Sequence, residues 1–492
     1  MDPGRWGDSF PVTFGARVSA PVDILAPPAT RPPGFWASVR EALRGSEQDF
    51  TTTPLRQAIL LLAVPMVLEM AMESVFALTD IFFVGRLGAD AVAAVGLTES
   101  LLSVVYALAM GLSVGVTAVV SRRIGEHDPE AASHAAAMGV LLGVVVAAVL
   151  GTLGVALAPT LLRLMGAPDA VIAIGGGYAR VMLGGEVSII LLFVANAIFR
   201  GAGDAAIAMR SLWLANLINI VLGPLLIFGP GPFPALGVTG AAVATTIGRS
   251  TGALWALSRL VRGGGRVQLA RRHLRVDVAL LRRLTSIGGA ASLQSLVGTA
   301  SWIGLVRVTA MFGAEALAGY TIAIRVVIFA ILPAFGMSNA AATLVGQALG
   351  ARDPERARRA VWQTGHYNAV FLTTLGAAFF VLAPGIVALF SRDPVVRAFA
   401  SDALRVIAVG FPLYGYGMVL VSAFNGAGDT RTPTLLNVAV FWVFEIPCAW
   451  ILARTVGMGP HGVFLAIAVA FSALALAAGV VFRRGTWARV EV

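Results

Sequence analysis

Apolar runs of about 20 residues, separated by short polar segments, recur along the whole chain. Each run is long enough to cross a bilayer as an α-helix, which rises about 1.5 Å per residue. The expected spans are residues 58–82, 95–121, 134–160, 171–199, 206–229, 238–261, 284–308, 318–346, 363–390, 397–424, 433–454 and 462–482. The pattern predicts an all-α polytopic membrane protein with twelve transmembrane helices.

The two halves of the chain repeat each other. Gly-Ala-Gly-Asp occurs at Gly201–Asp204 and again at Gly426–Asp429, an offset of 225 residues (426 minus 201). The same offset relates Gly88 to Gly313, Gly111 to Gly336, Gly125 to Gly350, Pro159 to Pro384, and Asp128-Pro129-Glu130 to Asp353-Pro354-Glu355. Each copy holds six spans, an even number, so both copies enter the membrane from the same side. The repeats are therefore parallel, and they predict two lobes around a central cleft.

This organisation gives five expected segments, with both chain ends on the cytoplasmic side. They are a disordered N-terminal tail (1–53) with a short interfacial helix around Trp36–Leu43, an N-lobe (54–261), a basic linker (262–283), a C-lobe (284–485) and a C-terminal tail (486–492).

Composition supports a membrane protein and narrows its class. Hydrophobic residues make up 58% of the chain and charged residues 13%, too few to cover a soluble surface. The chain has no lysine, so all 36 basic residues are arginines, and most lie in alternate connections between spans. That distribution places those connections in the cytoplasm, and it accounts for the arginine-rich linker without nucleic acid. We expect a monomer in the inner (plasma) membrane.

Enzyme chemistry finds no support in the sequence. A Walker-type ATPase loop needs a lysine, and the five histidines are scattered. The single cysteine, Cys448, excludes an intramolecular disulfide and makes a cysteine metal site improbable. We therefore expect neither an enzyme nor a cofactor.

Three acids in the first span are the candidate chemistry. At 100° per residue, Glu69, Glu73 and Asp80 lie within about 40° of one another on the helix surface, over about 16 Å of rise. Lipid would exclude such a face, so it should line a cavity or the bundle interior. The column could exchange protons, neutralise a cationic ligand, or pair with buried arginines such as Arg325. Pro65, one turn before Glu69, favours a kink that is either static or coupled to protonation.

Other polar residues inside spans are candidate cavity residues. Asn196 and Asn219 could bind a substrate or join helices, Gln294 is the only side-chain amide or acid of the seventh span, and Glu445 precedes Pro447 in the eleventh. A pairing of Glu445 with Arg325 is the alternative to a cavity role.

The chain resembles the multidrug and toxic compound extrusion (MATE) family over about residues 54–485. The motifs that carry the resemblance are Asp80–Gly88 leading to Ala91–Gly96, the two Gly-Ala-Gly-Asp turns, Asn219–Pro224 and Gly240–Thr245. The resemblance implies a V of two six-helix lobes that exports organic, often cationic compounds in exchange for H⁺ or Na⁺. It also implies that Asp80 takes part in ion coupling, with Asn196 and Asn219 lining the cavity near it.

Two departures from the family pattern shape the functional hypothesis. Gly223 stands where many prokaryotic members have Asp, and the seventh span lacks the Glu of some branches. We therefore hypothesise that Glu69 and Glu73 supply the missing acidity in an exporter of organic cations driven by H⁺ or Na⁺. The alternative is a lipid or polysaccharide-precursor flippase of the same superfamily. The 225-residue offset maps the three acids onto Gln294, Gly298 and Leu305, so the N-lobe should hold the coupling site.

Overall fold

The computed structural model describes residues 34–45, 48–490 and 492, and this part of the chain contains helices and no strand. The N-terminal half contains α1 (Phe35–Arg44), α2 (Leu55–Val84), α3 (Ala89–Gly125), α4 (Pro129–Leu164), α5 (Asp169–Gly184), α6 (Glu186–Ala202), α7 (Ala205–Phe228) and α8 (Val238–Arg262). The C-terminal half contains α9 (Val278–Ala310), α10 (Ala314–Gly350), α11 (Pro354–Ala388), α12 (Pro394–Ala408), α13 (Phe411–Gly426), α14 (Arg431–Asn437), α15 (Ile446–Trp450) and α16 (Pro460–Arg483). Two π-helical stretches, Val438–Glu445 and Ile451–Thr455, complete the span that α14 begins.

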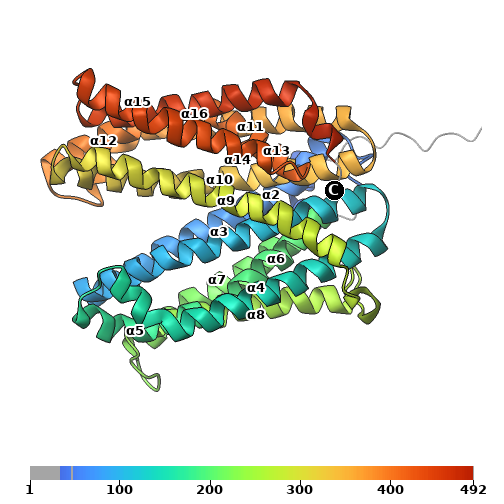
Figure 1. The fold of residues 1–492 in the computed structure, drawn as a ribbon, viewed down its shortest axis with the longest axis horizontal. Coiled ribbons are helices and arrows are strands. Elements are labelled where there is room, and N and C mark those ends of the chain that lie inside the picture. Colours follow the sequence, from blue (N-terminus) through green and yellow to red (C-terminus); the bar gives the residue numbers. More distant parts are fainter. Residues whose placement is uncertain (1–33, 46–47, 491) are drawn as a thin grey trace, which may run out of the picture.

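The helices form two lobes, and the predicted all-helical polytopic fold is confirmed. In the described residues nine helical segments are long and apolar enough to cross a bilayer, and the bent pair α12–α13 makes a tenth. The other two expected spans are α8 and α9, which have 25 and 33 residues but are rich in Gly, Ser and Thr. Helices of the two lobes lie together at one end of the molecule and diverge toward the other, which gives a V (Figure 1). We call the joined end, which carries residues 48–53, 263–277 and 486–490, the linker end.

Contacts between the lobes occur in pairs whose residues are related by the 225-residue offset. A Cβ built on Gly111 of α3 would lie 2.5 Å from the backbone nitrogen of Ser292 in α9. The residue equivalent to Gly111 in the C-lobe is Gly336 (111 plus 225), and the residue equivalent to Ser292 in the N-lobe is Val67 (292 minus 225). These two residues also meet, because a Cβ on Gly336 would lie 2.6 Å from the backbone nitrogen of Val67. Real side chains do not approach that closely, so glycine is required at both positions. The two lobes are therefore related by a pseudo-two-fold axis, as expected for parallel repeats.

Two expected spans are broken where the sequence suggested continuous helices. The fourth is divided at Gly185 into α5 and α6, and the tenth is divided around Gly410 into α12 and α13, which meet at 60°. These glycines are 225 residues apart (410 minus 185). A Cβ on Gly185 would lie 2.6 Å from the hydroxyl of Thr246, and one on Gly410 would lie 2.8 Å from the carbonyl of Ala468. Each break thus lets a helix approach its neighbour closely.

Helix starts at the linker end are specified locally. Asp128 accepts a hydrogen bond from the backbone nitrogen of Ala131 at 2.9 Å, and Asp353 accepts one from Arg356 at 2.8 Å. Each aspartate is an N-cap followed by proline, which needs no donor partner at the first helical position. α4 and α11 therefore begin in the same way in the two lobes.

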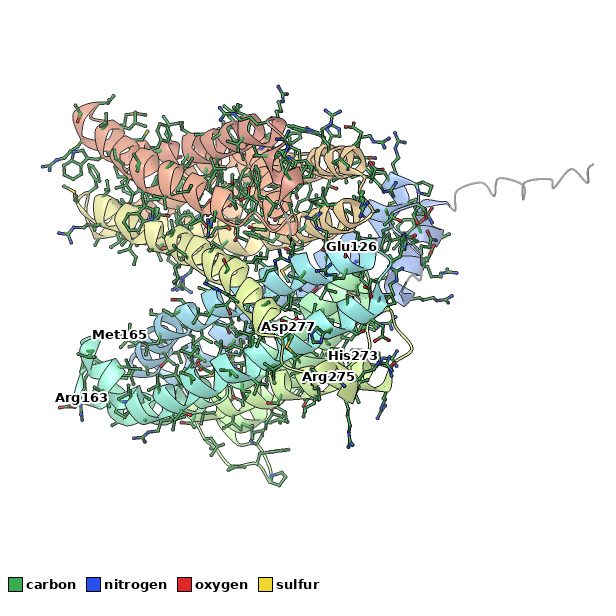
Figure 2. All side chains as sticks on the ribbon, turned by 45° about the vertical axis from the view of Figure 1, so that its right-hand side comes forward. Glu126, Arg163, Met165, His273, Arg275 and Asp277 are labelled. Carbon is green, nitrogen blue, oxygen red and sulfur yellow. The ribbon has the colours of Figure 1, made fainter. Side chains whose placement is uncertain are left out.

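The linker packs against the N-terminal part of α4. The imidazole of His273 lies 2.7 Å from a Glu130 carboxylate oxygen, and that of His134 lies 3.8 Å from Asp277. Asp277 also caps α9, and the hydrogen bond from the backbone nitrogen of Leu280 lowers the pKa of its carboxyl. Figure 2 shows His273 and Asp277 near one end of α4, and Arg163 at the opposite end.

The N-terminal segment differs from the expected disordered tail where the structure describes it. Residues 35–44 form α1, in the region where a short interfacial helix was expected, and its C-terminal carbonyls accept hydrogen bonds from Arg210. Phe50 is only 2% exposed. Ala42 and Phe50 belong to a buried apolar cluster with residues of α2, Ala205 of α7 and Ala340 of α10, so they pack against both lobes. Most of the expected tail (1–33) lies outside the described residues.

Candidate functional site

The three acids of the first span lie on α2, which packs against α7 in its own lobe and α10 in the other. Pro65 lies inside this helix, next to the point where Met66 contacts Gly336 of α10. Proline removes one main-chain hydrogen bond, so α2 can bend there without losing a further one.

Glu69 is held in a buried ion pair with Arg200. Oε1 of Glu69 accepts from Nη1 of Arg200 at 2.7 Å, and the two side chains are 2% and 11% exposed. The same oxygen accepts from Asn196 Nδ2 at 3.2 Å, and Asn196 Oδ1 accepts from the hydroxyl of Ser211 at 2.5 Å. The sequence placed Arg200 in a cytoplasmic connection, but α6 continues to Ala202 and its arginine points into the lobe. This network ties α2 to α6 and α7.

Glu73 has a looser partner one turn along α2. Its carboxylate lies 3.5 Å from Arg249 of α8 and accepts from Asn216 of α7 at 3.0 Å, and the Glu73 side chain is 25% exposed. The guanidinium carbon of Arg249 also lies 5.6 Å from the ring centre of Phe76 and 5.4 Å from that of Tyr106. Aromatic faces stabilise a cation at this distance. A carboxylate beside two rings is thus an environment suited to a positive charge, which Arg249 supplies.

Asp80 lies two turns farther from the linker end and has no hydrogen bond or ion pair with another described residue. Arg249 attracts its charge at longer range, and Glu99 of α3 repels it. Of the three acids on this face, Asp80 is therefore the one whose charge is not neutralised by a contact in the described part of the chain.

The two expected cavity amides lie between helices of the N-lobe. Asn196 joins Glu69 to Ser211, and Asn219 donates to the hydroxyl of Thr245 at 2.6 Å. They are 3% and 6% exposed. Both satisfy neighbouring polar groups, and neither is hydrogen-bonded to Asp80.

The C-lobe contains polar groups that remain unsatisfied. Within the described residues Glu445, 2% exposed, forms no hydrogen bond or ion pair, and Gln294 Oε1 is buried without a partner. Arg325, proposed as a partner for Glu445 or the column, is exposed on α10 and attracts Glu99 instead. Glu445 is the last residue of a π-helical stretch, and such stretches often occur at functional positions.

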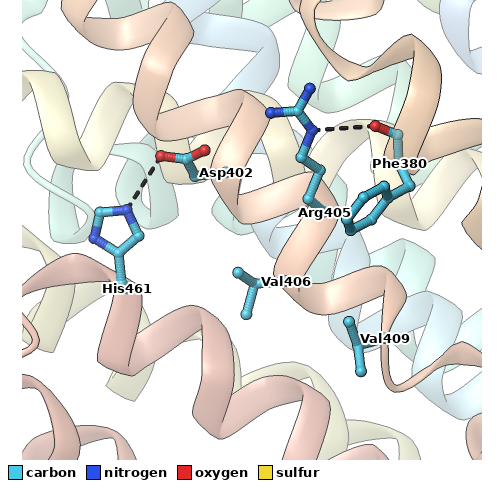
Figure 3. A pocket seen from close by; sticks show the side chains of 6 residues that line it. All are labelled: Phe380, Asp402, Arg405, Val406, Val409 and His461. Carbon is cyan, nitrogen blue, oxygen red and sulfur yellow. Dashed lines mark hydrogen bonds and ion pairs between the residues drawn. The ribbon is translucent and has the colours of Figure 1, made fainter.

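A shallow surface pocket lies elsewhere, among α11, α12 and α16 of the C-lobe. Asp402 and His461 meet across it at 3.2 Å, and Arg405 donates to the carbonyl of Phe380 at 3.1 Å (Figure 3). It shares no residue with the column on α2. Within the described residues no group of three His, Cys, Asp or Glu side chains could hold a metal ion.

Sequence reasoning found the acids but missed two side chains that bind them and one aromatic ring that contacts Arg249. Arg200, Asn216 and Tyr106 come from α6, α7 and α3. One signal was available: Asn216 precedes Asn219 by three residues and therefore shares its face of α7.

Two parallel helical lobes, a first span that contains a proline, and buried acids on that span define a membrane transporter. The MatE family model matches residues 65–225 and again residues 290–451, so the second match begins 225 residues after the first. The chain belongs to the MatE family and is a MATE efflux transporter, which bears out the expected family and class.

Relatives of the chain extend over nearly its whole length. It is 26% identical to the probable multidrug resistance protein YoeA of Bacillus subtilis, over 84% of this chain and 90% of the relative. It is also 26% identical to a FAD transporter of Shewanella oneidensis, over 81% of this chain and 88% of that protein. A crystal structure of MATE in complex with MaL6 covers 91% of this chain and 98% of its own, at 28% identity and a TM-score of 0.84. These relatives are transporters rather than enzymes.

Proposed function

We propose that the protein exports small organic cations in exchange for protons, by rocking its two lobes between outward- and inward-open states. It works as a monomer without a cofactor, in the plasma membrane, with both termini in the cytoplasm. The arginine-rich linker end supports that orientation. The lobes diverge away from this end, which corresponds to an outward-open state (Figure 1).

The single observation that carries the proposal is that Asp80, alone among the three acids on this face of α2, has no contacting cation among the described residues and lies near the Glu73–Arg249 pair. A carboxylate without a counter-ion binds a proton or cation more readily than one already paired. Glu73, at 3.5 Å from its arginine and partly exposed, can exchange Arg249 for a proton or a cationic cargo. Glu69, closer to its arginine and fully enclosed, serves instead as an anchor.

Transport in proteoliposomes under separately imposed gradients tests this function. A fluorescent organic cation should move when a proton gradient alone is applied, and Asp80→Asn should reduce that movement by at least tenfold. Asp90→Asn, an exposed acid at the start of α3, is the matched control. Movement under a Na⁺ gradient alone would replace H⁺ with Na⁺, and movement under neither would refute ion-coupled export of cations.

A phosphate-bearing cargo is the second candidate. It is favoured by Arg325, a cation exposed on α10 and within electrostatic reach of Glu99 of α3. Similarity to the FAD transporter adds to it. Competition by FAD against the cationic dye in the same liposomes would support this cargo, and Arg325→Gln should then weaken the competition but leave dye transport intact.

A further inference from the structure

Two segments outside the membrane spans cross from one lobe to the other at the linker end. We call residues 48–53, which precede α2, the strap, and the described residues 486–490 and 492, which follow α16, the tail. The strap continues into the N-lobe and contacts the C-lobe, whereas the tail extends from the C-lobe and contacts the N-lobe. Neither segment has a part in the proposed transport site.

The strap is bound to the C-lobe by one arginine of α11. Arg356 donates through Nε and Nη2 to the carbonyl of Phe50, at 3.1 and 2.6 Å, and through Nη2 to the carbonyl of Thr53. Charged donors form stronger hydrogen bonds than neutral ones. Because α2 begins two residues after Thr53, these bonds fix the start of α2 relative to α11.

The ring of Phe50 fills a notch in the N-lobe. A Cβ on Gly203 would lie 2.7 Å from Cε2 of this ring, so the close approach requires a glycine, as does its φ of +92°. Arg266 of the linker also contacts this ring, with its guanidinium carbon 5.3 Å from the ring centre. The same arginine donates to the carbonyls of Gln48 and, at 3.1 Å, Ala202. Phe50 thus joins the N-lobe and the linker, while its carbonyl binds the C-lobe.

The tail uses an equivalent notch. A Cβ on Gly428, at φ +85°, would overlap the side chain of Val492, which is 7% exposed. Arg122 and Arg123 of α3 donate to the carbonyls of Val490 at 2.6 Å and Val492 at 3.5 Å. Gly203 and Gly428 are the third residues of the two Gly-Ala-Gly-Asp motifs (428 minus 203 is 225). Each copy of the motif therefore provides a notch for a terminal segment.

We propose that the strap and the tail form a two-part clasp that holds the lobes together at the linker end and must release before this end opens. The proposal rests on the rocking motion of the proposed function. Separating the lobes at the linker end pulls α11 away from the start of α2, and α3 away from the tail. That movement breaks the hydrogen bonds of Arg356 to the strap and of Arg122 to the tail.

Distance measurements between the lobes test the clasp without relying on transport. Spin labels on Arg262→Cys and Arg484→Cys, two exposed positions on α8 and after α16, report separation of the linker ends in a Cys448→Ser background. Arg356→Gln should raise the ratio of separated to joined molecules about tenfold, because hydrogen bonds from a charged donor are lost. Arg358→Gln is the matched control, since its exposed side chain pairs with Glu355 of the same helix.

A cross-link provides the converse test and does not depend on a weakened fold. Thr53→Cys and Arg356→Cys, bridged by a short bifunctional thiol reagent in the Cys448→Ser background, should reduce transport at least tenfold, and reduction of the bridge should restore it. Full transport by the bridged protein would overturn the clasp. So would an unchanged distance distribution in Arg356→Gln while substrate or a gradient still separates the linker ends. If no condition separates them in any variant, the rocking motion fails together with the clasp.

Discussion

Substitution of Glu69 by Gln distinguishes an anchoring acid from a coupling acid. The change keeps the shape of the side chain and its acceptor for Asn196, and it removes only the negative charge. Arg200 then remains in the lobe with its side chain 11% exposed and no carboxylate beside its guanidinium. The expected consequence is loss of stability rather than a selective loss of ion coupling.

The magnitude follows from burial. Removing one member of a buried ion pair costs about 3–5 kcal/mol, because the other charge loses its compensation. Arg200 keeps some contact with solvent, so the lower end, about 3 kcal/mol, applies here. At Glu73 the distance to the arginine is longer, 3.5 Å, and the side chain is 25% exposed, so Glu73→Gln should cost only about 1 kcal/mol of folding free energy. A difference of about 2 kcal/mol changes the folded-to-unfolded ratio roughly 30-fold.

Thermal unfolding of the purified protein in detergent measures this difference. Glu69→Gln should have a clearly lower midpoint than Glu73→Gln, and the double variant Glu69→Gln/Arg200→Gln should recover most of the loss, because no buried charge remains. A Glu69→Gln variant as stable as the native protein, with altered ion coupling, would refute the anchoring role and return Glu69 to the coupling column.

Three further outcomes are expected. Asp80→Asn should flatten the pH dependence of dye transport without changing the melting temperature, because Asp80 contacts no described charged or hydrogen-bonding partner; a matching fall in stability would contradict this. Gly336→Val should lower both the melting temperature and transport, since its Cβ would overlap the carbonyl of Met66 and force α10 away from α2; native values for both would disprove tight lobe contact. Asp128→Ala should cost about 1 kcal/mol in thermal unfolding through loss of the cap on α4, with dye affinity unchanged; a weaker dye affinity would point to a wider role.

The architecture could be predicted because its signals are local or repeated. Apolar runs set the spans, and repeated glycines such as Gly111 and Gly336 mark close helix contacts that the structure contains. The breaks at Gly185 and Gly410 were not predicted, because an apolar run alone does not show where a neighbouring helix will press against it. Only the contacts with Thr246 and Ala468 explain them.

The sequence could predict only the part of the site that lies on α2. Helical periodicity places Glu69, Glu73 and Asp80 on one face, but it contains no information about which residues from other helices meet that face. Arg200 lies 131 positions after Glu69, and Arg249 lies 176 after Glu73. Arg200 was harder to recognise because it precedes a Gly-Ala-Gly-Asp turn, where an arginine ordinarily indicates the cytoplasmic end of a span. Long side chains at helix ends can reach several residues inward, so a position at a span boundary does not fix where the charge lies.

The different partners of the three acids on α2 suggest an order in which they would bind an ion. In the proposed cycle, a cation that enters between the diverging ends of the lobes would meet Asp80 first, because Asp80 lies farther from the linker end than Glu69 and Glu73. To reach Glu73 it must displace Arg249, whose guanidinium also lies beside Phe76 and Tyr106. Released Arg249 would then repel the cation or bind another group, so occupation of Glu73 must be coupled to movement of α8 or of α2. Asp80 can accept an ion without such rearrangement, whereas Glu73 cannot. In the proposed cycle, therefore, ion capture belongs to Asp80, and the conformational response begins at Glu73.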